Sequence, residues 1–218
     1  MLLRLVLFPL LLTAFNGYAQ PRSFHNPGDV FIRFNPLGVI DLSDFHLSFG
    51  VERILKNRFS AGVDAGWIYD SPLFERANRS RGFLLHPFMR YYRGPRTFYI
   101  ESELRYRRVD HQFTDWLWRG VDNDVPSYEE FTSFRFRKQQ ASLNLKIGRV
   151  LPLTADGKLC WEPYMGMGLQ RSKFTIVGEQ NSAYTYNNWP WRWSSGEVHY
   201  RPSLLFGIRV SFSVHSRV

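Results

Sequence analysis

The sequence is poor in cysteine and in long apolar runs. Its only cysteine is Cys160, so no disulfide can form within one chain. Beyond residues 1–19 it has no apolar run near the ~20 residues that a membrane-spanning helix needs. The mean hydropathy is low, at −0.31. These absences exclude a disulfide-stapled fold and a helical membrane protein. With 218 residues, we expect one domain of the barrel or sandwich type.

The one strongly apolar stretch lies at the start and has the parts of a secretory signal peptide. Arg4 is followed by an apolar run from Leu5 to Phe15, and the small residues Gly17 and Ala19 precede Gln20. The alternative, a transmembrane anchor, fits poorly because the run is only about half as long as a bilayer requires. We therefore predict cleavage after Ala19 and the following organisation: residues 1–19 signal peptide, 20–28 short N-terminal lead-in, 29–218 outer-membrane β-barrel.

Acidic residues are fewer than basic residues. The chain has 28 Lys and Arg against 19 Asp and Glu, a formal net charge of +9. Removal of Arg4 with the signal peptide leaves +8. Basic exported proteins often meet anionic surfaces, and lipopolysaccharide phosphates are a better partner for such a chain than nucleic acid. Arg76, Arg79 and Arg81 are candidates to pair with those phosphates.

Alternation of apolar with polar or small side chains is the main pattern from Asp29 onward. Phe45, Leu47, Phe49 and Val51, for example, alternate with His46, Ser48, Gly50 and Glu52. This period of two is typical of transmembrane β-strands, which need apolar residues only on the lipid-facing side. Eight such segments predict an all-β, eight-stranded antiparallel up-and-down transmembrane β-barrel: Val30–Ile40, around Phe45–Glu52, Phe59–Tyr69, Gly82–Arg93, Thr97–Val109, Arg135–Val150, Leu159–Phe174 and Val198–Val214.

The connections between these segments alternate in length, as outer-membrane barrels require. The links after the second, fourth and sixth strands are short or fairly short: Lys56-Asn57, Gly94–Arg96 and Leu151–Lys158. Those after the third, fifth and seventh strands are long: Asp70–Arg81, Asp110–Phe134 and Thr175–Glu197. Proline removes a ladder donor, so we expect bulges or breaks at Pro36, Pro87, Pro163 and Pro202.

The strand parity also predicts what lies inside the barrel. Eight strands leave an interior just wide enough for side chains, and unpaired buried charges are costly, so we expect a paired ion network. A narrow polar channel or a small-ligand site is the alternative. The expected lumen network is Glu52, Asp64, Arg90, Glu101, Glu103, Arg105, Arg107, Lys146, Glu162, Arg201 and Arg209, with His86 and His199 facing the same way.

Three short runs carry a resemblance to a known family. They are Phe34-Asn35-Pro36-Leu37-Gly38, Ser48-Phe49-Gly50-Val51-Glu52 and Phe59-Ser60-Ala61-Gly62-Val63. They resemble the opening hairpins of small outer-membrane β-barrel proteins of Bacteroidota, and the architecture is similar to that of OmpA and OmpX. The run Phe206–Phe212 resembles the C-terminal signal that the barrel-assembly machinery reads, although six residues follow it. This resemblance implies the cell outer membrane as the location.

The same architectural resemblance includes lipid A acyltransferases and deacylases that use His with Ser and an acidic residue. The candidates here are His46, His86, His111 and His199 with Ser48, Ser60, Ser102 or Ser203. No signature selects among them, so we predict that the protein is not an enzyme and needs no cofactor.

The long loops are rich in aromatic residues. Trp116, Trp118, Trp189, Trp191 and Trp193 form either an aromatic girdle at the membrane interface or a surface that binds an extracellular glycan or protein. Loop carboxylates such as Asp110, Asp122 and Asp124 do not follow calcium-loop spacing, so no metal is expected. We predict a non-enzymatic outer-membrane barrel with a structural or surface-interaction role. The alternatives are a lipid A-modifying enzyme and a soluble periplasmic lipocalin-like barrel.

Overall fold

The computed structural model describes residues 27–40, 44–56, 58–93, 97–122, 125–179, 181–188 and 191–214. The predicted signal peptide lies outside the described residues, as does nearly all of the lead-in. The described chain is almost wholly β-structure, with two short 3₁₀ helices, η1 (Pro36–Ile40) and η2 (Pro72–Phe74). No described helix is both long and apolar enough to cross a membrane.

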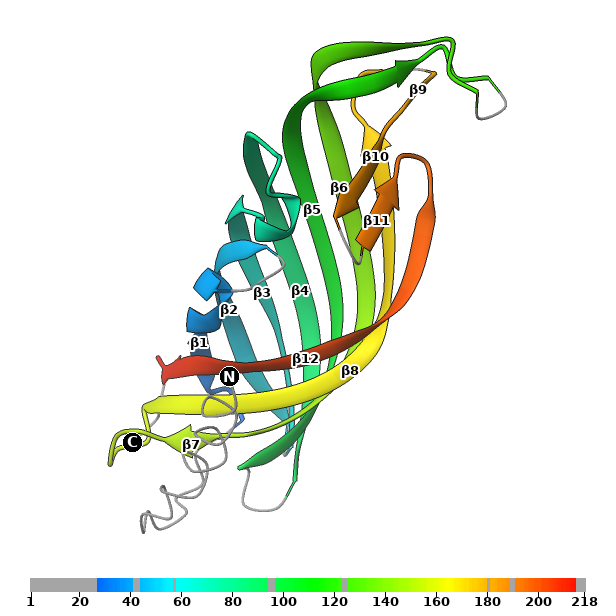
Figure 1. Ribbon diagram of the computed structural model, residues 1–218. Coiled ribbons are helices and arrows are strands. Elements are labelled where there is room, and N and C mark those ends of the chain that lie inside the picture. The colour runs from blue at the N-terminus through cyan, green and yellow to red at the C-terminus, as the bar shows by residue number, and fades with distance from the viewer. Residues whose placement is uncertain are drawn as a thin grey trace, which may run out of the picture.

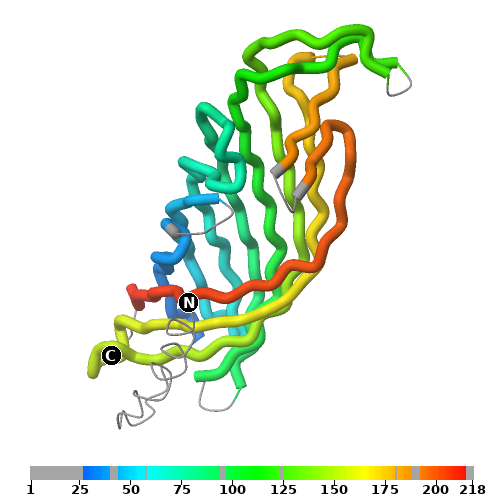
Figure 2. Tube along the Cα trace, in the orientation of Figure 1, coloured from blue at the N-terminus to red at the C-terminus, as the bar shows by residue number. Residues whose placement is uncertain are grey.

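The main strands form one antiparallel up-and-down sheet that closes into a ring (Figures 1 and 2). The pairings run from β1 through β2, β3, β4, β5, β6 and β8 to β12, and β12 pairs again with β1. The short strand β7 (Leu151–Pro152) extends the sheet beside β8. The strands of the ring are β1 (Val30–Phe34), β2 (Phe45–Lys56), β3 (Phe59–Asp70), β4 (Arg79–Arg93), β5 (Phe98–Arg119), β6 (Tyr128–Arg149), β8 (Leu159–Ile176) and β12 (Val198–Ser213).

Two predicted loops are largely strand. The range Asp110–Phe134 was expected to be a loop, but β5 and β6 stay paired out to Arg119 and Tyr128, so only the tip between them is a connection. Cross-strand pairs such as Trp116 with Phe131, whose ring centroids lie 5.5 Å apart, stabilise this extension. The range Thr175–Glu197 contains β9 (Ser182–Ala183) and a hairpin of β10 (Thr185–Asn188) and β11 (Trp191–Ser194).

The first strand is shorter than predicted, and the proline in it explains why. β1 ends at Phe34, and η1 begins at Pro36, which has no N–H to donate to a ladder. The other three prolines behave differently. Pro163 and Pro202 pair across β8 and β12 without a register shift, and Pro87 only interrupts the ladder with β5. The expected bulge or break is therefore present at Pro87 and absent at Pro202. At Pro163 the ladder with β12 continues, but the ladder between β6 and β8 ends at the neighbouring Tyr164.

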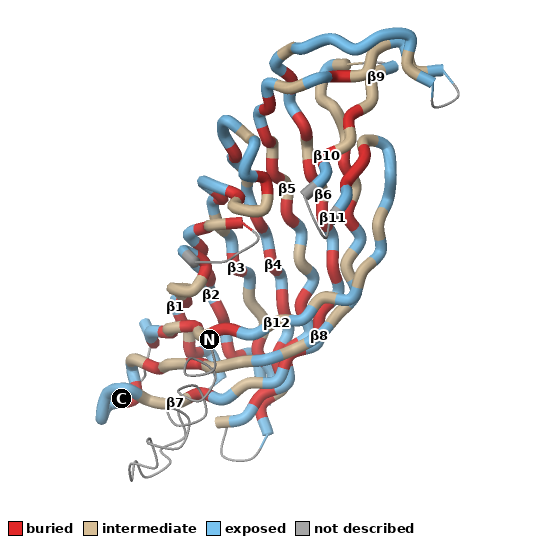
Figure 3. The backbone as a smooth tube through the Cα atoms, viewed as in Figure 1, coloured by how far each residue is buried: buried red, intermediate tan, exposed pale blue. Residues whose placement is uncertain are grey.

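Burial alternates along each strand, as Figure 3 shows. Side chains that point outward are apolar and exposed over the middle of the ring, most strongly on β12 and β8, where Leu204 and Phe206 are each 78% exposed. We call this surface the apolar belt: Leu47, Phe49, Val51, Val63, Trp67, Phe83, Leu85, Met89, Ile100, Leu104, Leu143, Leu145, Ile147, Met165, Met167, Leu169, Leu204 and Phe206. Charged and polar side chains fill the interior.

The inward face of β5 passes through every layer of the interior. At the turn end, where β2 meets β3, Tyr99 belongs to a small apolar cluster with Phe31, Ile54 and Cys160. Glu101 and Glu103 come next, followed by Arg105 and Arg107. Val109 then lies in a small apolar layer with Ile68 and Leu84. At the other end, the aromatic cap fills the space between the strands and the β10–β11 hairpin: Phe74, Phe113, Leu117, Phe134, Phe136, Phe174, Tyr184, Tyr186 and Trp193.

Candidate functional site

The interior holds a dense ion network at the level of Glu101. The Arg90 guanidinium donates to Glu101 at 2.6 Å and to Glu52 at 2.8 Å, and its third nitrogen lies 2.8 Å from Glu162. Arg209 donates two hydrogen bonds to Glu101, at 2.7 and 2.9 Å. Every one of these side chains is almost completely buried. Each charge therefore has an opposite charge within hydrogen-bond distance, which is the condition under which buried ions are tolerated.

The structure brings most of the predicted lumen residues together and adds others. Of the predicted network, all but Arg105 and Arg201 are buried, and these two are partly buried. Arg33, which the sequence reasoning missed, is also buried and lies 3.2 Å from Asp64. Its position between the outward Ile32 and Phe34 could have identified it. The network thus joins five carboxylates (Glu52, Asp64, Glu101, Glu103, Glu162) with five cations (Arg33, Arg90, Arg105, Lys146, Arg209).

A second polar cluster lies nearer the cap, around Asp44, which the sequence reasoning also missed. The Asp44 carboxylate accepts hydrogen bonds from Lys138 at 3.0 Å, from Arg107 and from Ser71 at 2.6 Å. Burial alone would raise the pKa of this carboxyl, but the attraction of Lys138 and Arg107 outweighs it and holds the pKa well below its usual range. Arg107 therefore belongs to this cluster, one layer above the network in which it was expected.

His111 forms a pair with Ser80, a serine that was not among the candidates. The Ser80 hydroxyl lies 2.9 Å from His111 Nδ1. Burial lowers the pKa of His111 to about 3, because the buried imidazolium would lose its hydration. The imidazole is stacked on Phe74, with ring centroids 4.0 Å apart, and is fully buried. Among the described residues, both members of this pair are buried away from solvent.

Of the other catalytic candidates, His46, His86, Ser48 and Ser203 line one cavity of the interior. His46 hydrogen-bonds the Asp44 carbonyl at 2.9 Å, His199 lies beside Glu197 at 3.3 Å, and Ser60 donates to Glu52. Ser102 is exposed on the outer wall.

One set of residues has the donor types of a metal site. Asp64, His86 and Glu103 offer ligand atoms within 4.8 Å of one another. The carboxylates of this set already lie against Arg33, Arg209 and Lys146. A divalent cation would have to displace or face these positive charges, so the electrostatics of the set do not favour a metal ion.

The outer wall carries a basic collar directly above the belt, on the cap side. It consists of seven cations on four neighbouring strands: Arg79, Arg81, Arg108, Arg135, Arg137, Arg171 and Lys173. One carboxylate lies among them, Asp110, which accepts two hydrogen bonds from Arg137 at 2.6 and 3.0 Å. Arg137 lowers the pKa of Asp110, so this carboxyl stays ionised and neutralises only one of the cations.

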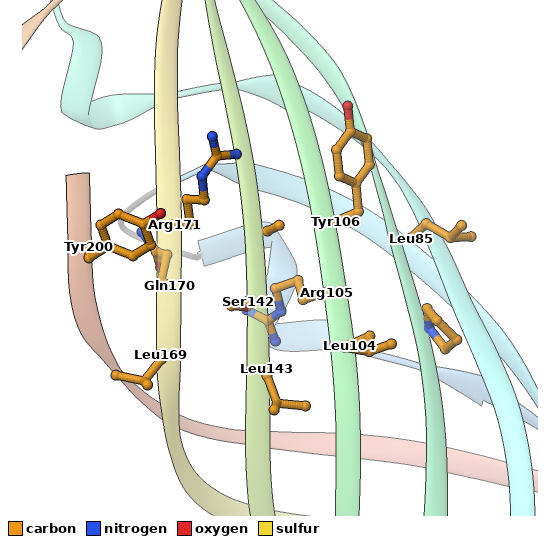
Figure 4. Close-up of a pocket in the computed structure, with 12 residues that line it drawn as sticks. Leu85, Leu104, Arg105, Tyr106, Ser142, Leu143, Leu169, Gln170, Arg171 and Tyr200 are labelled. Atoms are coloured by element: carbon orange, nitrogen blue, oxygen red, sulfur yellow. The ribbon is translucent and has the colours of Figure 1, made fainter. Parts of the chain in front are cut away.

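Below the collar is a groove of about 520 Å³ on the outer wall. Ala141 lines it, as do larger side chains that include Tyr106, Arg171 and Tyr200. Figure 4 shows Leu104, Leu143 and Leu169, on three neighbouring strands, at the belt side of this groove. The groove thus joins the apolar belt to the basic collar.

The predicted aromatic binding residues are divided between surface and interior. Trp116 is exposed and packs on Phe131, and Trp118 donates to Glu129 at 2.7 Å, both on the long β5–β6 hairpin. Trp193 is buried in the aromatic cap, so it is not part of an exposed binding surface, contrary to the expectation. Trp189 lies outside the described residues, and Trp191 is described only as part of β11.

Comparisons with known proteins add little to this picture. No family model matches the chain, and no curated protein matches it significantly. The resemblance to the Bacteroidota family therefore stays a prediction. Among similar solved structures is the beta domain of the Bordetella autotransporter Brka, with 14% sequence identity, 86% of this chain and 99% of that chain covered, and a TM-score of 0.34. That score is too low to support an argument.

Proposed function

We propose that the chain is an eight-stranded β-barrel that spans a bacterial outer membrane. The observation that carries the proposal is the inverted polarity of the ring. Leu169, Leu204 and Phe206 are more than 70% exposed on the outside, while Arg90, Glu101 and Lys146 are buried inside. Such a surface is stable in lipid, and closing the ring leaves few unpaired backbone groups at its edges.

The dimensions of the belt agree with this reading. β2 and β3 each have 12 residues, close to the ~9–11 that a tilted strand needs to cross the hydrocarbon core. β5 and β6 each have 22 residues and therefore project well beyond that core on one side. Longer extensions on one side are typical of the extracellular face.

The collar supports the same orientation and indicates the lipid partner. Its clustered arginines lie where the head groups of the outer leaflet would meet the wall. Arginine pairs strongly with phosphate, so we propose that the collar contacts lipopolysaccharide phosphates and that the groove at Ala141 receives an acyl chain.

The role that fits best is structural or in surface interaction, without catalysis. Ser80 and His111 lie beneath Phe74, and the lumen is filled by paired ions. The exposed tip of the β5–β6 hairpin, with Trp116 and Phe131, is the surface we propose for an extracellular glycan or protein. During assembly, β12, which contains Phe212, would be presented to the barrel-assembly machinery. A soluble lipocalin-like barrel would need the opposite polarity, with an apolar lumen.

Membrane fractionation combined with gel mobility tests the proposal. The protein should be recovered with outer membranes, and the unboiled, detergent-extracted form should migrate differently from the boiled form. Recovery as a soluble periplasmic protein whose mobility does not change on boiling would overturn it.

A further inference from the structure

The pairing of β1 with β12 closes the ring along only part of its height. β1 pairs with β12 over Phe31–Phe34 and Val210–Ser213, and β1 then gives way to η1. Toward the cap, no described strand joins β12 to β2. η1 lies in this interval and contacts both of them, and Gly38 allows it to sit tightly against His46, because a Cβ there would come within 2.7 Å of that residue.

A cavity of about 640 Å³ lies behind this interval. Both edges of the interval line it, with Leu37 and Gly38 of η1 on one side and Ser203 and Leu205 of β12 on the other. Its deeper walls come from the lumen: Ser48, Asp64, His86, Arg105, Arg107, Gln140, Tyr164 and Arg209. The cavity therefore connects the interior of the ring with its side.

Among the described residues, buried side chains fill both ends of the ring. Toward the turn end lies the ion network of Arg90, Glu101 and Glu162, where every side chain is buried. Toward the cap lie the Asp44 cluster and then the buried aromatic side chains around Phe113. A molecule that reaches the cavity from the belt would pass sideways, between β12 and η1.

The lining selects a particular kind of molecule. Three arginines and one carboxylate, Asp64, line the cavity. Each arginine has a carboxylate partner: Arg105 lies 3.2 Å from Glu103, Arg209 lies 2.7 Å from Glu101, and Arg107 pairs with Asp44. Arg105 has the most accessible side chain of the three, 15% exposed against 3% for Arg107 and for Arg209. Two buried groups on the wall, His86 Nε2 and Gln140 Oε1, have no hydrogen-bond partner among the described residues. Unsatisfied buried polar groups are costly. A head group that accepts hydrogen bonds would satisfy His86 when its Nε2 carries the proton, whereas Gln140 Oε1 is itself an acceptor and needs a donor such as water.

The rim of the cavity is apolar where it meets the belt. Leu37, Leu204 and Phe206 all line it, and Leu204 and Phe206 are among the most exposed residues of the belt. An acyl chain could lie across these side chains while its head group is inside. Charge at depth and apolar surface at the rim together match an amphiphile with a single chain.

We propose that this cavity binds the carboxylate head of a fatty-acid-class amphiphile that enters laterally from the membrane between β12 and η1, with Arg105 as the residue that pairs with the carboxylate. The inference rests on the proposed membrane location.

The test uses purified, folded full-length protein in vesicles of zwitterionic phospholipid, with a dansyl-labelled undecanoic acid as probe. Fluorescence titration should show saturable binding with one site per chain. Arg105→Gln should weaken binding at least tenfold, because it removes a charge-assisted contact. Glu103 keeps Lys146 as a partner in that variant. The methyl ester of the probe should bind correspondingly less well than the acid.

Two further variants separate this site from partition into the belt. Ser203→Trp should abolish saturable binding by filling the entrance. Arg53→Gln removes an exposed cation from the outer face of β2 at the turn end, away from the cavity, and should leave the affinity unchanged. Equal binding by Arg105→Gln, Ser203→Trp and the unmodified protein, or no saturable binding at all, would overturn the inference. A heat-dependent gel shift, recorded on the same samples, tests separately whether the barrel is folded. If binding is absent but the gel shift is present, the inference about the cavity fails while the proposed function is still supported.

Discussion

Neutralising Glu101 should destabilise the ring more than any single change on its surface. The Glu101 carboxylate is fully buried and lies within 3.0 Å of nitrogens on Arg90, Lys146 and Arg209. Glu101→Gln keeps the shape of the side chain and removes only the charge. The balance of five carboxylates and five cations then becomes an excess of one buried positive charge.

The magnitude follows from the number of partners left behind. Breaking a buried ion pair by removing one member costs about 3–5 kcal/mol, because the other charge stays buried without compensation. We expect the free energy of unfolding to fall by about this amount in Glu101→Gln. Lys146→Met alone should cost a similar amount, because Lys146 lies against both Glu101 and Glu103.

The double variant Glu101→Gln/Lys146→Met restores the charge balance. Its loss should be at least about 1 kcal/mol smaller than the sum of the two single losses, since residues in direct contact couple by about 0.5–3 kcal/mol. The assay is urea unfolding of the protein in lipid vesicles, followed by tryptophan fluorescence. Asp156→Asn, in an exposed turn, is the control. A Glu101→Gln variant as stable as this control, or strict additivity in the double variant, would refute the paired network.

Three other predictions concern pH, access and lipid contact. In the folded protein the pKa of His111 is lowered from its ordinary 6.5 to about 3. The protein should therefore lose stability as the pH falls below 6.5. Between pH 6.5 and 4.5 its free energy of unfolding should fall by about 2 kcal/mol more than that of His111→Gln. Cys160 is 1% exposed, so a maleimide should label it slowly in the folded state and rapidly after unfolding in urea. Leu104→Arg in the belt should cost about 2–4 kcal/mol in vesicles, whereas Gln112→Arg, on the same face of β5 beyond the belt, should cost at most about 1 kcal/mol.

Each of these has a result that contradicts it. Parallel stability curves for the protein and His111→Gln between pH 6.5 and 4.5 would show that His111 is hydrated. Equal labelling rates before and after unfolding would place Cys160 outside the buried cluster. If Leu104→Arg and Gln112→Arg were equally stable, the exposed leucines would not face lipid.

The sequence predicted much of the ring because the period-two pattern is a local signal. Phe45, Leu47 and Phe49 alternate with His46 and Ser48, and the same parity is seen in the structure. What failed was the length of elements at the cap end. The β5–β6 extension has no simple polarity pattern, because beyond the belt its outer side faces water while aromatic side chains such as Phe113 and Phe134 pack inside.

The candidate site was only partly predictable, for a related reason. Parity assigns Arg90 and Arg209 to the interior, but it cannot say that Arg107 pairs with Asp44, because Asp44 lies outside any predicted strand. The cavity depends on where β1 stops. Pro36 marks that point in the sequence, yet the 3₁₀ turn that follows is determined by packing against β2 and β12.

The short seam between β1 and β12 also bears on how the ring is made and how it comes apart. It joins the first described strand to the last, so it cannot form until β12 has been synthesised, and contacts between distant segments form slowly. Four residues on each side hold it, Phe31–Phe34 and Val210–Ser213, whereas β5 and β6 are paired along their full lengths. When the ring is heated or stretched, separation should begin at this seam, and amide hydrogens of β1 should exchange before those of β5.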